Sequence, residues 1–387
     1  MRILISTPSM QGFGIDFVTT IANELSSKGH YIDVVQFSGK SSSDKLNVTP
    51  VLVNRTIDEA LGYNVTSNGR WIFNWVLYRR WRRVINQQLT NDEYDIVVSD
   101  RICSTPGTLA AQECGVPTVI ITTGPAAVRY DATNDNLDKT PRLSSLSPSK
   151  KLQYPFIRNI HSWNTKAFES ATNIIAVSDF DASITRHTFG RQPKVVFLPV
   201  RLDDFVVAEH DPLKVTMINP RTKNKGLNMF LAVAEQLPNV KFQIAGSLYD
   251  DTMKNKIDKL DNVTFLGWCD EMREVYQNTK LLLIPSQYEE GGPRIIPEAF
   301  ANGIPVVGSD LGGIPDYIGD GGEVIADYNS VQPWVSAVKR FVEDDTYYQE
   351  KSEIARKRSQ LFELDDRIDE IETVFESATR VQLDSAR

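Results

Sequence analysis

The sequence predicts two doubly wound α/β domains that face each other across a cleft. In both halves of the 387-residue chain, short apolar runs with strand spacing alternate with segments of helical spacing. Such alternation is typical of parallel sheets that carry helices on both faces. A polar stretch at 200–212 interrupts it, and each half is long enough to bury a core of its own.

The first half begins with a strand at 2–6, a glycine-containing loop at 8–14 and a helix at 15–27. Further strands are expected at 31–37, 94–99, 117–122 and 195–199, and further helices at 107–114 and between Ser178 and Phe189. Ser178 is the expected N-cap of the last of these helices. We therefore place an N-terminal Rossmann-like domain at 1–200.

The second half repeats the pattern. Its expected strands lie at 214–219, 240–245, 262–266, 280–285, 304–308 and 323–325, and its helices at 226–236, 251–260, 270–278 and 297–302. From residue 331 onwards the chain has a charged, helical pattern. We place a C-terminal Rossmann-like domain at 201–365 and expect a last helix, at about 366–387, to pack back on the first domain.

Composition narrows the class of protein. The net charge of −8 argues against a general nucleic-acid binder. Three scattered cysteines, the absence of a membrane-length apolar run and a strand pattern that begins at residue 2 favour a cytoplasmic protein without a signal peptide. The four histidines show no metal-ligand spacing, so that we expect no metal site.

The most informative segment is 289–307, where a glycine-bearing loop joins a strand to a short helix. Gly291 and Gly292 allow the backbone to approach a ligand closely, and Pro297 suits the first helical position. The helix start favours a phosphate, whereas the carboxylates of Glu290 and Glu298 repel phosphate and accept hydrogen bonds from hydroxyls. The pattern fits a sugar nucleotide, although both acids can also be solvated charges at a helix start.

These residues resemble the E-x7-E signature of the retaining GT-B glycosyltransferases of family four, also described as glycosyl transferases group 1. Glu290 and Glu298 stand at the two acidic positions. The segments 308–316 and 262–268 are also similar to that family. The resemblance is strong across about 214–325 and weaker in the first half.

The resemblance implies a role for each residue of the motif. Glu298 would bind the ribose hydroxyls, and Glu290 would bind hydroxyls of the donor sugar. The backbone of Gly292, Pro293 and Arg294, next to Gly291, would line the sugar and the diphosphate. The base would lie near Gly267 and Trp268, and the first-domain loop with Gly12 and Gly14 would close over the diphosphate.

The segment 219–226 contains the basic residues that the family uses to neutralise the leaving diphosphate. Lys225 and the glycine after it match the family's Lys-Gly pair. The family arginine lies five residues before the lysine, where this chain has Pro220, so that Arg221 or Lys223 is the candidate replacement. The alternative is a solvated basic loop.

Two further features concern the donor site. The family often has a histidine that contacts the donor sugar after the strand at 118–122, and this chain has Thr123 there. Asp179 and Asp181 match the metal-binding D-x-D of another glycosyltransferase fold. Because acids in the first turn after an N-cap are common, we interpret them as helix-start residues and expect metal independence.

A helix at 70–89 combines aromatic residues with arginines. Trp71 and Trp75 share one side, as do Phe73, Leu77 and Trp81. Aromatic rings with arginines suit peripheral contact with an anionic membrane surface or a lipid-phosphate acceptor. A core-facing aromatic stripe covered by extended arginines is the interpretation we prefer.

The resemblance implies a retaining hexosyltransferase that moves a sugar from a nucleotide diphosphate sugar, its co-substrate, to a hydroxyl acceptor without a further cofactor. The acceptor class, whether glycan, lipid-linked or small molecule, stays open. A catalytically silent sugar-nucleotide-binding or scaffold subunit is the alternative, because the family's histidine is missing and its arginine is displaced. A sugar-nucleotide epimerase of similar architecture is disfavoured by the E-x7-E segment.

Overall fold

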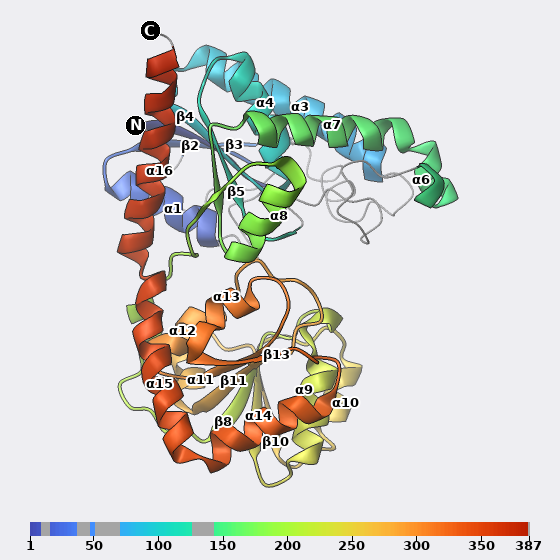
Figure 1. Cartoon of the computed structure of the whole chain (residues 1–387), viewed down its shortest axis with the longest axis vertical. Helices are drawn as coiled ribbons and strands as arrows, with labels where there is room; N and C mark the ends of the chain where they lie inside the picture. Colours follow the sequence, from blue (N-terminus) through green and yellow to red (C-terminus); the bar gives the residue numbers. More distant parts are fainter. Residues whose placement is uncertain (9–15, 37–46, 51–69, 126–142, 386–387) are drawn as a thin grey trace. The chain divides into compact units, whose positions relative to one another are not determined.

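A computed structural model of the chain describes residues 1–8, 16–36, 47–50, 70–125 and 143–385. The chain divides into two compact units, of which the first comprises 1–196 with 368–387 and the second comprises 197–367. Each unit contains one parallel sheet flanked by helices (Figure 1). The units thus change over at 196/197 and 367/368, where the sequence predicts 200/201 and 365/366.

The first sheet has the strand order β3-β2-β1-β4-β5-β6-β7 among the described residues. Its strands are β1 (Arg2–Ser6), β2 (Tyr31–Gln36), β3 (Asn47–Pro50), β4 (Ile96–Asp100), β5 (Thr118–Thr122), β6 (Asn173–Ala176) and β7 (Lys194–Val195). All neighbouring strands run parallel. The order reverses between β1 and β4, which creates a topological switch point, as in doubly wound nucleotide-binding folds.

The helices of the first unit include α3, which carries the aromatic residues noted in the sequence. They are α1 (Asp16–Ser27), α3 (Arg70–Asn91), α4 (Ser104–Glu113), α6 (Pro148–Leu152), α7 (Tyr154–Ser170) and α8 (Asp179–Phe189). The predicted N-cap of α8 is confirmed, because Ser178 Oγ accepts a hydrogen bond of 3.2 Å from the Asp181 backbone N–H. Asp179 and Asp181 lie in the first turn of this helix.

The aromatic side chains of α3 belong largely to the core of the first unit. Trp71, Tyr78 and Trp81 are buried. The Trp81 indole N–H donates a hydrogen bond of 2.8 Å to Ser6 Oγ, at the end of β1. The core-facing interpretation of this helix therefore accounts for these rings.

The second sheet has the order β10-β9-β8-β11-β12-β13, again fully parallel, with its reversal between β8 and β11. Its strands are β8 (Lys214–Ile218), β9 (Lys241–Ala245), β10 (Val263–Gly267), β11 (Thr279–Ile284), β12 (Val306–Ser309) and β13 (Gly322–Ile325). Its helices are α9 (Leu227–Gln236), α10 (Thr252–Ile257), α11 (Met272–Gln277), α12 (Ile295–Ala301), α13 (Ile314–Ile318), α14 (Val331–Glu343) and α15 (Asp345–Ser359).

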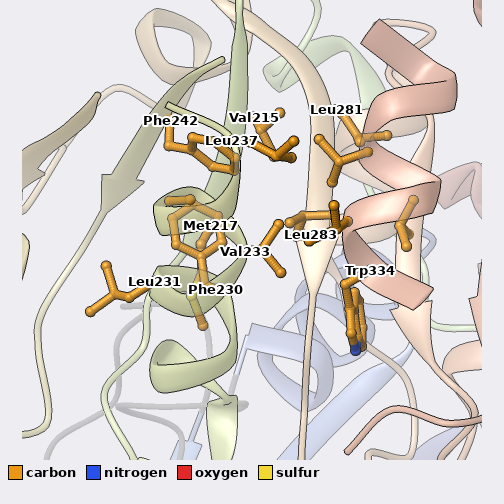
Figure 2. Packing of buried hydrophobic residues seen from close by; sticks show 14 of the residues in the cluster. Val215, Met217, Phe230, Leu231, Val233, Leu237, Phe242, Leu281, Leu283 and Trp334 are labelled. Atoms are coloured by element: carbon orange, nitrogen blue, oxygen red, sulfur yellow. The ribbon is translucent and has the colours of Figure 1, made fainter. Parts of the chain in front are cut away.

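Alternate residues of the central strands build the core of the second unit. Val215 and Met217 of β8 and Leu281 and Leu283 of β11 turn the same way, because side chains along a strand alternate between its faces. Figure 2 shows these side chains packed with Phe230 of α9 and with other apolar residues that include Trp334 of α14. This packing fixes β8 and β11, and it therefore fixes the points at which the loops after these strands begin.

The last helix, α16 (Leu364–Ser385), belongs to the first unit from residue 368 onwards. Glu372 receives a hydrogen bond of 2.9 Å from Lys28 and lies 2.6 Å from the His30 ring nitrogen Nε2. The hydrogen bonds that Lys28 donates to the carboxylates of Asp369 and Glu372 raise the pKa of Lys28 to about 12. Asn173 also donates a hydrogen bond of 2.8 Å to Ser377 Oγ of this helix.

The predicted strand at 195–199 is wrong beyond its first residue, because β7 ends at Val195. Phe197 packs against the Tyr317 ring with centroids 5.1 Å apart, and the Leu198 N–H donates a hydrogen bond of 3.2 Å to the Tyr317 hydroxyl. Val200 then forms a β-bridge with Glu363. Aromatic contacts within the second unit therefore replace strand pairing at this point.

We expect Trp334→Ala to lower the free energy of unfolding of the second unit by about 3–5 kcal/mol, because it leaves a large cavity in the core. Trp334 is 0% exposed, whereas Trp268, at 63% exposed, provides a matched control. Trp268→Ala should change stability by less than about 1 kcal/mol. Chemical denaturation monitored by circular dichroism measures both, and equal losses would contradict the packing described above.

Candidate active site

Two loops meet at the switch point of the second sheet. One follows β8 at 219–226, and the other follows β11 at 285–294. The Gln287 backbone N–H donates a hydrogen bond of 2.7 Å to the Asn224 carbonyl oxygen. Gly226 has a φ of +84°, and a Cβ there would lie 1.8 Å from the Pro285 carbonyl oxygen. Only glycine permits this close approach of the two loops.

An ion pair joins the two loops. Lys225 Nζ lies 2.7 Å from Glu290 Oε2, and the hydroxyl of Ser286 donates a hydrogen bond to Glu290 Oε1. Glu290 is only 8% exposed, so that a negative charge on its carboxylate would be costly without these partners. The structure thus brings together Lys225 and Glu290, which lie 65 residues apart in the sequence.

The surroundings keep Lys225 protonated at neutral pH. Burial by itself lowers the pKa of Lys225, but the Glu290 carboxylate and the Tyr288 hydroxyl together more than offset this effect, and the pKa is raised above its usual value. The Lys225 ammonium also lies 5.4 Å from the centroid of the Tyr288 ring. Burial, followed by the charge of Glu290, raises the pKa of the Tyr288 hydroxyl. The site therefore holds a fixed positive charge beside a nearly buried carboxylate.

The segment after β12 fixes the backbone of Glu290. The Gly313 N–H donates a hydrogen bond of 2.6 Å to the Glu290 carbonyl oxygen. Gly312 has a φ of +62°, and a Cβ there would lie 2.4 Å from the same oxygen. Sequence reasoning noted this segment only through its family resemblance, and it did not assign Ser286, Gly312 or Gly313 to the site.

The second acid of the motif, Glu298, lies in the first turn of α12 and is also 8% exposed. The hydroxyl of Tyr276, on α11, donates a hydrogen bond of 2.7 Å to Glu298 Oε2. Burial, followed by the nearby Glu298 carboxylate, raises the pKa of Tyr276 well above its usual value. Tyr276 therefore stays a proton donor to Glu298, and nothing in the sequence pattern singled it out.

The loop between the two acids is tightly packed. A Cβ at Gly292 would lie 2.2 Å from the Tyr317 hydroxyl, and Gly291 and Pro293 are buried. Arg294 is half-buried and stands directly before α12. The helix begins at Ile295, so that Pro297 is its third residue and not its first as predicted. Proline is tolerated there because N–H groups of the first turn have no partner within the helix.

Two of the other predicted residues lie at the carboxyl end of β10, on the same edge of the second sheet. Gly267 has a φ of +73°, and its carbonyl oxygen accepts a hydrogen bond of 2.6 Å from the Gly246 N–H. The indole of Trp268 is exposed and donates a hydrogen bond of 2.8 Å to Asp270.

The remaining predicted residues lie in different surroundings. Arg221 and Lys223 are exposed on the loop that carries Lys225. Thr123 belongs to the first unit, where it is half-buried directly after β5. Gly12 and Gly14 lie outside the described residues.

Two features are absent from the described residues. None of the helices in those ranges is long and apolar enough to cross a membrane. Within the same ranges, no three histidine, cysteine, aspartate or glutamate side chains come together as a metal site would require.

Comparison with known proteins places the chain in a family. Residues 16–203 match the model described as Glycosyltransferase Family 4, and residues 202–358 match the model described as Glycosyl transferases group 1. D-inositol 3-phosphate glycosyltransferase of Mycolicibacterium smegmatis is 30% identical over 131 residues, which cover 31% of this chain and 30% of that protein. A 41.2 kDa protein of the cps region of Klebsiella pneumoniae is 26% identical over 187 residues, 44% of this chain and 50% of that protein. The matches thus span half or less of these curated relatives.

Two solved structures have the same fold over almost the whole chain. HepE of Anabaena, in complex with UDP, gives a TM-score of 0.73 at 17% identity and covers 97% of this chain and 100% of its own. Sucrose-phosphate synthase of Thermosynechococcus elongatus gives a TM-score of 0.70 at 15% identity, with 100% of both chains covered. The predicted GT-B fold class, with two doubly wound Rossmann-like domains, is thereby confirmed. The chain belongs to the family 4, group 1 glycosyltransferases, whose two models together match it from residue 16 to residue 358.

Proposed function

We propose that the protein transfers a hexosyl group from a nucleotide diphosphate sugar to a hydroxyl acceptor, with retention at the anomeric carbon. The observation that carries this proposal is the Lys225–Glu290 ion pair at the switch point, with Glu298 on the adjoining helix. Ligands of doubly wound folds bind at such switch points. Support for the donor class comes from HepE, whose structures contain UDP and UDP-glucose.

Lys225 is the residue we assign to the leaving diphosphate. Its ammonium has three N–H donors, of which the contact with Glu290 Oε2 uses one. A charge that is already in place and shielded from water stabilises a developing phosphate charge without reorganisation. Arg221 or Lys223, on the same loop, would supply further positive charge.

The two glutamates bind hydroxyl groups in this proposal. An ionised carboxylate accepts hydrogen bonds and repels phosphate, so that the acids suit the ribose and the sugar instead of the diphosphate. Glu298, oriented by Tyr276, binds the ribose, and Glu290, oriented by Ser286 and Lys225, binds the donor sugar. The two acids are given different roles because they have different partners. Glu290 pairs with Lys225, the lysine assigned to the diphosphate, whereas Glu298 pairs with Tyr276.

The other predicted residues complete the donor site. The backbone of 291–294 lines the sugar and the diphosphate, and Gly267 and Trp268 lie near the base. No protein nucleophile and no metal ion is required, because positioning and fixed charge act on the leaving group. In this proposal the protein acts in the cytoplasm, and its acceptor is a hydroxyl compound.

A thermal-shift screen against UDP-, GDP-, ADP- and dTDP-sugars tests the proposal, since a ligand that binds only the folded state raises its stability. Donor hydrolysis without acceptor is then measured with the sugar nucleotide that gives the largest shift. A rise in melting temperature together with donor hydrolysis supports the proposed transferase. A rise in melting temperature without hydrolysis or transfer would favour the silent sugar-nucleotide-binding subunit. No shift with any donor would overturn both.

We expect Lys225→Ala to reduce kcat by about 10²–10³-fold with a much smaller change in donor KM, because the lysine acts most strongly as charge builds on the leaving diphosphate. Lys225→Arg keeps the charge and should recover part of the rate. Lys254→Ala, an exposed lysine on α10, is the matched control. Steady-state kinetics measure the effect, and an unchanged kcat would remove Lys225 from the mechanism.

The two acids should behave differently when each is replaced by glutamine. Glu298→Gln should raise the Kd for free nucleoside diphosphate by about tenfold to a hundredfold, because hydrogen bonds to charged groups are worth roughly 1.5–3 kcal/mol. Glu290→Gln should leave that Kd near the wild-type value while transfer falls. Calorimetric titration separates the two, and equal losses of affinity would refute the division of roles.

Activity should persist in EDTA, since fixed basic residues take the place of a cation at the diphosphate. The measurement is transfer or donor hydrolysis after exhaustive chelation, compared with the same protein after Mn²⁺ or Mg²⁺ is added back. Loss with EDTA and recovery with either metal would show that this assignment is wrong.

A further inference from the structure

The first unit carries a strongly basic region in a chain whose net charge is −8. Helix α3 contains five arginines and no acidic residue. Helices α6 and α7 together contain four basic residues and a single glutamate. Basic charge is therefore concentrated on a few helices, and the excess of acidic residues lies elsewhere in the chain.

These helices adjoin each other where α3 begins (Figure 1). The Trp71 backbone N–H donates a hydrogen bond of 3.0 Å to the side chain of Gln153, the residue between α6 and α7. Further along α3, Trp75 stacks on Trp163 of α7 with ring centroids 6.3 Å apart. The same Trp75 ring meets Phe156 edge-on at 5.5 Å. The packing holds the basic helices together as one surface.

Exposed aliphatic side chains accompany the basic residues of α3 and α6. Ile72 and Val76 of α3 are 42% and 51% exposed, and Leu152 at the end of α6 is 85% exposed. Ile72, Val76, Arg80 and Arg83 recur at helical spacing on the exposed side of α3. Lys151, which is exposed, stands next to Leu152. We call these six residues the α3–α6 face.

We propose that the α3–α6 face docks on an anionic lipid surface. Basic side chains next to exposed aliphatic ones match both properties of a bilayer interface, which offers negative headgroups above apolar chains. A soluble polyanion such as a nucleic acid or an acidic polysaccharide would leave Ile72, Val76 and Leu152 in water. The buried aromatic rings of α3 contribute by holding the face rigid instead of by inserting into lipid.

Co-sedimentation with vesicles tests the proposal on the full chain. The protein should bind vesicles that contain phosphatidylglycerol, should bind pure phosphatidylcholine vesicles far more weakly, and should lose affinity as salt screens the headgroup charge. Arg80→Gln/Arg83→Gln should lower the partition coefficient about 25-fold, at about fivefold for each basic residue near the surface. Ile72→Ser/Val76→Ser should lower it about tenfold or more without changing the charge.

Matched controls lie in the second unit. Lys254→Gln/Lys259→Gln removes the same charge from exposed positions, and Val206→Ser/Leu213→Ser removes exposed aliphatic side chains. Neither should alter binding, and all variants should keep the wild-type melting temperature and donor hydrolysis in solution. The proposal is overturned if the α3–α6 variants bind vesicles like wild type. It is also overturned if the serine variants keep full affinity while heparin competes, because the partner is then a soluble polyanion.

Discussion

The candidate active site depends on stabilising one nearly buried carboxylate, that of Glu290. Glu290 is only 8% exposed, and an unpaired charge in such a position costs several kcal/mol. Lys225 neutralises it and the Ser286 hydroxyl occupies its other oxygen, while Gly313 holds its backbone. The loops after β8, β11 and β12 must therefore keep their mutual positions for the charge to remain satisfied.

Close backbone approach makes that arrangement possible. At Gly226 and at Gly312 a side chain would collide with a carbonyl oxygen, and both residues have a positive φ. Without these glycines, the loop that carries Lys225 could not lie against the loop that carries Glu290. The core beneath β8 and β11 anchors the two loops, since their strands are neighbours at the switch point.

Burial has opposite consequences in the two units. In the second unit it isolates charged groups at the carboxyl edge of the sheet, where Tyr276 and Ser286 orient the acids. In the first unit it removes Trp71, Tyr78 and Trp81 of α3 from the surface and leaves Ile72, Val76, Arg80 and Arg83 exposed. These aromatic residues of α3 thus lie in the core while its exposed arginines lie at the surface. The amino-acid composition of the helix does not reveal this arrangement.

The sequence by itself determined the α/β class, the order of most strands and helices, and the segments that supply Lys225, Glu290 and Glu298. Local periodicity and glycine-containing loops are enough for that, because they depend on neighbours a few residues apart. Tertiary structure decided the contacts between distant segments: the Lys225–Glu290 ion pair, the hydrogen bond from Tyr276 to Glu298 and the glycines that support Glu290. Tertiary structure also decided that residues 197–199 form no strand, because Phe197 and Leu198 contact Tyr317 instead. Such contacts arise only when the sheet order brings remote loops to one edge, and strand order is not encoded in local spacing.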